Sequence, residues 1–108
     1  MNEAGSNESL SVEIDTEGTI IVHGDIDIAG GPTLEAAILS HESSNSIVLD
    51  LNDVTFIDSS GLRSLLDASR RALARNSTVR LRSVGPEVTR LLQITGTTDQ
   101  FTIESSRG

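Results

Sequence analysis

Residues 46–73 constrain the fold most strongly, because a strand pattern passes there into a helix pattern. The apolar run Ile47-Val48-Leu49 predicts a central strand that is covered on both faces. After it, apolar or small residues recur at i, i+3, i+4, i+7 and i+11, which predicts one amphipathic helix; these residues are Leu62, Leu65, Leu66, Ser69 and Leu73. A strand that leads into a helix in this way is expected to reach a parallel neighbour by a right-handed crossover.

The rest of the chain supplies short elements of the same two kinds. Residues 10–14 alternate apolar and polar side chains, and a Thr-Glu-Gly turn separates them from an apolar run at 19–22, so a hairpin is expected. A loop over 24–31 leads to a helix that Pro32 opens, with Leu34, Ala37, Ile38 and His41 at helical spacing. A strand over 78–84, a helix from Pro86 to a stop at Gly96 and an edge strand over 101–103 complete the pattern. The predicted fold class is α/β, with a mixed sheet of four to five strands and about three main helices packed on it.

Composition limits the classes of function. The 108 residues suffice for one core, and 36% hydrophobic residues is typical of a globular domain. We expect this domain over 10–104, a disordered tail at 1–9 and a flexible tail at 105–108. The net charge of -8 argues against nucleic acid and against an anionic membrane surface as partners. The chain has no cysteine, no run of membrane-spanning length and no apolar signal region in 1–9, which favours a cytoplasmic protein.

The segment Phe56-Ile57-Asp58-Ser59-Ser60-Gly61-Leu62 carries the most chemistry. Its two hydroxyls stand at a helix start, where four backbone N–H groups are unpaired and the helix dipole is positive. Asp58 or Ser59 can cap the helix, which is worth about 1 kcal/mol. The same position tolerates a phosphate, which adds about 1.5 to 2 negative charges and would disturb a partner's binding more than the fold. The residues alone favour the cap, and Phe56 is expected in the core.

Other polar residues support weaker hypotheses. Asp25 and Asp27 could hold a metal or help to position a kinase's nucleotide, although loop carboxylates are more often simply solvated. His23 and His41 have no cysteine or second histidine at ligand spacing, so no metal site is expected. Ser59 or Ser60 could act as a nucleophile, but the chain lacks a Gly-x-Ser-x-Gly elbow and is short for a substrate cleft, so no enzyme is expected. One face of the predicted helix is charged and is expected to be solvated, with Asp67 pairing four residues on; it contains Arg63, Asp67, Arg70, Arg71 and Arg75.

The segment 47–62, which ends in Asp58-Ser59-Ser60-Gly61-Leu62, resembles the STAS domain of bacterial anti-sigma factor antagonists. Gly24-Asp25-Ile26-Asp27 resembles the family's Gly-x-x-Asp, and residues 85–96 resemble its last helix and glycine stop. The resemblance extends over about 10–103, and its main departure is Gly30-Gly31-Pro32, where many members carry polar or helix-forming residues. That loop borders the family's partner surface.

This resemblance implies that Ser59 is both the cap and a phosphoacceptor. An anti-sigma factor with serine-kinase activity would phosphorylate Ser59, a serine phosphatase would reverse the change, and the unphosphorylated protein would bind the anti-sigma factor and release a sigma factor. The implied partner-binding residues are Asp25, Asp27, Asp58, Ser59, Ser60, Gly61 and Arg63. No catalytic residue, cofactor or metal is implied. The alternative is a STAS-like scaffold subunit of an ABC-type lipid transport or stress-signalling complex, although such members often carry a small residue where this chain has Ser60.

Overall fold

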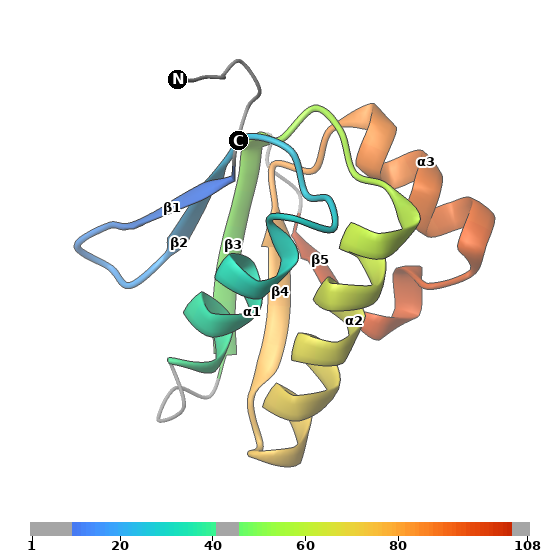
Figure 1. The fold of residues 1–108 in the computed structure, drawn as a ribbon. Helices are drawn as coiled ribbons and strands as arrows, with labels where there is room; N and C mark the ends of the chain where they lie inside the picture. Colours follow the sequence, from blue (N-terminus) through green and yellow to red (C-terminus); the bar gives the residue numbers. More distant parts are fainter. Residues whose placement is uncertain (1–9, 41–45, 105–108) are drawn as a thin grey trace, which may run out of the picture.

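The computed structural model describes residues 10–40 and 46–104, and its elements follow the predicted order (Figure 1). The strands are β1 (Ser11–Ile14), β2 (Ile20–His23), β3 (Ser46–Asp53), β4 (Thr78–Arg82) and β5 (Thr102–Glu104). The helices are α1 (Gly31–Leu39), α2 (Ser59–Ala74) and α3 (Pro86–Thr95), and a short 3-10 turn, η1 (Thr98–Gln100), follows α3. The two predicted tails and His41 lie outside the described residues.

The sheet has five strands in the order β1-β2-β3-β4-β5. The first two strands form the expected antiparallel hairpin, and each later strand is parallel to its neighbour. The predicted mixed sheet with helical crossovers is therefore confirmed. Strands β2 to β5 succeed one another in a single direction across the sheet, so right-handed crossovers place all three helices on the same face.

This one-sided arrangement makes the predicted two-sided covering of β3 wrong. In β3, Leu49 and its neighbours on the helix-facing side are buried, whereas Val48 and Asp50 on the other side are only half-buried. Figure 1 shows α1 and α2 side by side over one face of the sheet. The opposite face carries ion pairs instead of a second helical layer, including Arg82 with Asp50 and Arg80 with Glu104.

Three apolar residues lie elsewhere than the pattern predicts. Phe56 is 49% exposed, and the next residue, Ile57, is buried in its place. Leu73 is 63% exposed, whereas its neighbour Ala72 in the same last turn of α2 is buried. Ile14, at the hairpin end of the edge strand β1, is 49% exposed. The core itself is built mainly from the inward residues of β2, β3 and β4 and the stripes of the three helices.

The charged face of α2 is exposed as expected, but its ion pairs differ from the predicted ones. Asp67 pairs with Arg70, three residues later, at 3.0 Å, rather than with Arg71. The guanidinium of Arg71 instead contacts Glu35 of α1 at 2.9 Å and so connects the two neighbouring helices. Within the described residues, no helix is long and apolar enough to cross a membrane.

Candidate functional site

Asp58 caps the start of α2. Its backbone is extended, with φ -106° and ψ -179°, and its carboxylate Oδ1 accepts the backbone N–H of Gly61 at 2.7 Å. Ser59 is the first residue inside the helix, so the prediction that Ser59 is the cap is wrong. The physical reason is that a carboxylate on the preceding extended residue already reaches the third N–H of the helix. The hydroxyl of Ser59 therefore does not cap the helix.

A backbone bridge joins this helix start to the β2–α1 loop. Ile26 donates its N–H to the carbonyl of Phe56 at 3.0 Å, and its own carbonyl accepts the N–H of Asp58 at 3.2 Å. Ile26 and Ile57 thus form a parallel bridge outside the named strands, and both side chains are buried. The bridge places the loop that carries Asp25 and Asp27 beside Ser59, although these residues are far apart in the sequence. No local pattern in the sequence predicts this pairing.

Gly61 allows the close approach that the bridge requires. A Cβ atom at Gly61 would lie 1.9 Å from the carbonyl oxygen of Ile26 and 2.5 Å from its carbonyl carbon. Both are backbone atoms, which cannot rotate away as the end of a side chain could. Any residue other than glycine would therefore push the start of α2 away from the β2–α1 loop.

Gly31 explains part of the departure at Gly30-Gly31-Pro32. A Cβ atom at Gly31 would lie 2.2 Å from Oγ and 2.9 Å from Cβ of Ser64 in α2. The glycine pair thus lets the start of α1 pack closely on neighbouring elements. Helix α1 begins at Gly31, with Pro32 in its first turn, close to the predicted start.

The predicted site residues differ in what remains available to a partner. Ser59 and Arg63 are exposed, while Ser60, Asp25, Asp27 and Asp58 are half-buried and Gly61 is buried. The carboxylate of Asp27 accepts the backbone N–H of Gly30 at 2.9 Å, so it holds the turn into α1. Asp58 is occupied by the cap. Among the described residues, no cluster of three or more acidic, histidine or cysteine side chains could hold a metal ion.

The backbone around Ser59 can accommodate an anion. Asp58 donates its N–H to Ile26 and Gly61 donates to Asp58, whereas the N–H groups of Ser59 and Ser60 have no acceptor within the described residues. These two donors and the positive end of a 16-residue helix favour a negative group on the adjacent hydroxyl. The carboxylate of Asp58 opposes it by like-charge repulsion.

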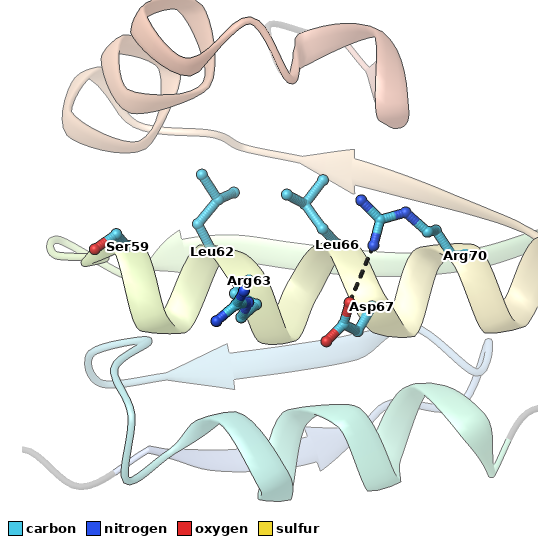
Figure 2. Close-up of a pocket in the computed structure, with 6 residues that line it drawn as sticks. All are labelled: Ser59, Leu62, Arg63, Leu66, Asp67 and Arg70. Carbon is cyan, nitrogen blue, oxygen red and sulfur yellow. Dashed lines mark hydrogen bonds and ion pairs between the residues drawn. The ribbon is translucent and has the colours of Figure 1, made fainter.

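Two hollows flank the site. One, of about 270 Å³, runs along the exposed side of α2, and Figure 2 shows Leu62 and Leu66 pointing toward α3 within it; its lining residues are Ser59, Leu62, Arg63, Leu66, Asp67 and Arg70. The other, of about 230 Å³, lies between the loop before α2 and α3, with the exposed Phe56 and Ile94 in its lining. Ile28, in the β2–α1 loop, is 74% exposed.

The apolar residues Ile28, Phe56 and Ile94 are therefore candidate contacts that the sequence analysis missed. Each lies in a pattern that also fits a buried residue, so only the structure separates them from the core. Ile28 and Phe56 lie in the two segments that the backbone bridge joins beside Ser59, and Ile94 extends the apolar area along α3 from Phe56.

Comparison with known proteins identifies relatives over almost the whole chain. The family model of the STAS domain matches residues 10–108. An anti-sigma-B factor antagonist from Listeria monocytogenes is 31% identical over 106 residues, which cover 93% of this chain and 93% of that protein. The crystal structure of an anti-sigma factor antagonist from Mycobacterium paratuberculosis is 29% identical, covers 94% of this chain and 89% of its own, and superposes with a TM-score of 0.69. The Bacillus cell fate determinant SpoIIAA in its phosphorylated form shares the fold, with 19% identity, 92% coverage of both chains and a TM-score of 0.65.

Proposed function

The chain belongs to the STAS domain family, and on this premise we propose that it is an anti-sigma factor antagonist that phosphorylation of Ser59 switches off. One observation carries the choice of residue: the hydroxyl of Ser59 is exposed at the first position of α2, while the cap is supplied by Asp58. A modification of Ser59 therefore adds charge without removing the hydrogen bond that holds the helix start.

The unphosphorylated protein binds an anti-sigma factor through the surface around Ser59. Ser59, Ser60 and Asp25 supply polar contacts, and Ile28 and Phe56 supply apolar area on either side. Asp27, Asp58 and Gly61 shape this surface from within, through the turn into α1, the helix cap and the contact with Ile26. Arg63 lies on the adjoining turn of α2. The partner supplies serine-kinase activity, a separate serine phosphatase restores the hydroxyl, and the cytoplasm is the expected location.

Phosphorylation acts mainly on the interface. A phosphate at Ser59 adds about 1.5 to 2 negative charges to a chain whose net charge is already -8. Two free N–H groups and the helix dipole compensate it within the free protein. In a complex the same dianion must be desolvated against the partner, and each 1.4 kcal/mol of lost binding energy is about a ten-fold weaker complex. A small change in stability thus accompanies a large change in affinity.

A binding role is favoured over catalysis at Ser59. A serine nucleophile needs a base within hydrogen-bond reach, about 2.6 to 3.2 Å. The described histidine, His23, instead contacts Glu13 at 2.9 Å and Asp53 at 2.7 Å, at the end of β2 and between β1 and β3. Neither serine of the Asp-Ser-Ser-Gly segment has a histidine partner in residues 10–40 and 46–104.

Direct binding measurements test the proposal. The partner is an anti-sigma factor with serine-kinase activity, and its affinity is measured by calorimetry for the unmodified chain, Ser59→Ala and Ser59→Asp. Ser59→Ala should bind within a few-fold of the unmodified chain, whereas Ser59→Asp should bind at least about ten-fold more weakly, because even one buried charge costs roughly 1.4 kcal/mol or more.

The matched control is Asn76→Asp, which adds the same charge at the opposite end of α2, about 24 Å away. It should leave the affinity unchanged. Equal affinities for Ser59→Ala and Ser59→Asp would contradict the proposal that charge at Ser59 controls binding. Stable co-purification with a nucleotide-binding transporter subunit, indifferent to Ser59→Asp, would favour the scaffold alternative.

A further inference from the structure

Arg63 differs from most of the arginines in having no ion-pair partner within the described residues. The engaged arginines and their acceptors are Arg70 with Asp67, Arg71 with Glu35, Arg75 with the carbonyl of Leu39, Arg80 with Glu104 and Arg82 with Asp50. In residues 10–40 and 46–104, only Arg63 and Arg90 have neither an ion pair with a carboxylate nor a hydrogen bond to a carbonyl. In a chain with a net charge of -8, an unpaired cation beside an acidic helix cap calls for an explanation.

Arg63 lies one helical turn after Ser59 and lines the same hollow (Figure 2). Residues four apart on a helix are surface neighbours, with Cβ atoms about 5 to 6 Å apart. Helical side chains also tilt toward the N-terminus, so the guanidinium of Arg63 leans toward the turn that carries Ser59. Both side chains are exposed, which leaves them free to meet in solvent.

We propose that Arg63 binds the phosphate of phospho-Ser59 within the same chain. This inference rests on the proposed modification of Ser59. A guanidinium offers paired N–H donors whose spacing matches two phosphate oxygens, and a charge-assisted pair of this kind is stronger than a neutral hydrogen bond. Asp67, the acidic residue four positions after Arg63, pairs through Oδ1 with Arg70 at 3.0 Å and forms no ion pair with Arg63 within the described residues.

Among the charged groups near Ser59, Arg63 is the one suited to bind the phosphate. On the helix itself, the carboxylate of Asp58 precedes the serine, and across the backbone bridge Asp25 adds a second negative group. Arg70, the other arginine of the hollow, is engaged with Asp67. On α3, Arg90 lines the separate hollow beside Phe56.

Among the described residues, Arg63 is therefore the arginine without an ion pair that shares a hollow with Ser59. Phosphorylation consequently changes the partner surface twice: it adds an anion, and it removes the free guanidinium of Arg63 from the surface that the partner meets.

Phosphorus NMR of the full chain, with phosphoserine incorporated at position 59 during synthesis, tests the pair. The second pKa of the phosphate is followed in the parent and in the Arg63→Ala, Arg63→Lys and Arg90→Ala variants. Loss of the guanidinium should raise this pKa by about 0.3 unit or more, because a nearby cation favours the dianion. Arg63→Lys should retain part of the shift, and Arg90→Ala should match the parent. In concentrated urea the difference should vanish, because the pairing needs the helix.

An Arg63→Ala variant with the parental phosphate pKa would overturn the inference, and so would a difference that persists in urea. The measurement needs no kinase and no partner. If the phosphate responds to Arg63 but Ser59→Asp leaves partner binding intact, the proposed function fails while the pair stands. If Ser59→Asp blocks binding but the phosphate pKa does not change in Arg63→Ala, the proposed function stands and the pair between Arg63 and the phosphate fails.

Discussion

Replacing Gly61 by alanine tests whether the contact between α2 and the β2–α1 loop positions the site. Helix propensity alone predicts a gain, because alanine is favoured over glycine inside a helix by about 1 kcal/mol. Packing predicts the opposite. The new methyl group would lie 1.9 Å from the carbonyl oxygen of Ile26, where no real Cβ atom can remain. The sign of the stability change therefore decides which effect controls this position.

The expected loss follows from the contacts that must move. Relieving the overlap separates the helix start from Ile26, which weakens two backbone hydrogen bonds: Asp58 N–H to Ile26, at 3.2 Å, and Ile26 N–H to Phe56, at 3.0 Å. Each is worth about 1 kcal/mol, and overpacking at a buried contact costs about 1 to 3 kcal/mol. With both hydrogen bonds lost and the gain in propensity subtracted, we expect Gly61→Ala to lower the free energy of unfolding by about 2 to 4 kcal/mol.

Urea unfolding followed by circular dichroism measures this loss. For a domain of this size the midpoint should fall by about 1 M or more. The matched control is Gly85→Ala at the start of α3, where a Cβ atom would have only the carbonyl oxygen of Val54 nearby, at 4.0 Å. Its stability should stay within about 1 kcal/mol of the parent, because no backbone atom has to move.

A Gly61→Ala variant at least as stable as the parent would refute the close-approach argument, since helix propensity would then have outweighed the contact. Partner binding gives a second readout. Gly61→Ala should weaken the complex even in conditions where the variant is fully folded, because it moves Ser59 relative to the loop that carries Asp25. Gly85→Ala should not.

Two further perturbations have expected outcomes. The hydrogen bond of His23 with Glu13, and to a lesser extent that with Asp53, raises the pKa of His23 above its ordinary value of 6.5. The contribution of His23 to stability is therefore fully present below pH 6.5 and is lost as the pH rises through the raised pKa of the folded state. The urea midpoint of the parent should thus fall as the pH rises from about 6 through the raised folded pKa of His23, and it should fall less in His23→Gln; parallel curves would contradict this. Gly31→Ala should destabilise the chain by about 1 to 3 kcal/mol through its overlap with Ser64, and Ser64→Gly in the same chain should restore part of the loss in thermal unfolding; additive losses would contradict it.

Sequence patterns were sufficient to predict the order and type of the elements, because each element is short and has a clear period. The stripe of α2 and the apolar run in β3 lead to the observed parallel crossovers. The same periods say nothing about how many faces of a strand are covered. That depends on the direction in which successive strands are added, and here this direction sends every helix to one side of the sheet.

The candidate site was harder to predict, because its geometry comes from one long-range contact. Phe56 and Ile57 are adjacent and both apolar, so composition cannot decide which of them enters the core. The bridge to Ile26 decides it by fixing the backbone on both sides, and it turns Ile57 inward and Phe56 outward. The choice of Asp58 rather than Ser59 as cap follows from the same contact, because the N–H of Asp58 is held by Ile26.

Within the four residues 58–61, the helix cap, the close backbone contact and the exposed hydroxyl belong to three different residues. Asp58 satisfies a helix N–H, and Gly61 admits the backbone of Ile26, so the fold depends on both of them. Ser59 lies between them, exposed and free of either role. If Ser59 were the cap, a phosphate on its oxygen would alter the group that holds the helix, and modification would change folding and binding together. With the cap on the preceding carboxylate, the proposed phosphate on Ser59 would leave the helix start and the adjoining loop in position, and its effect would fall on the binding of a partner.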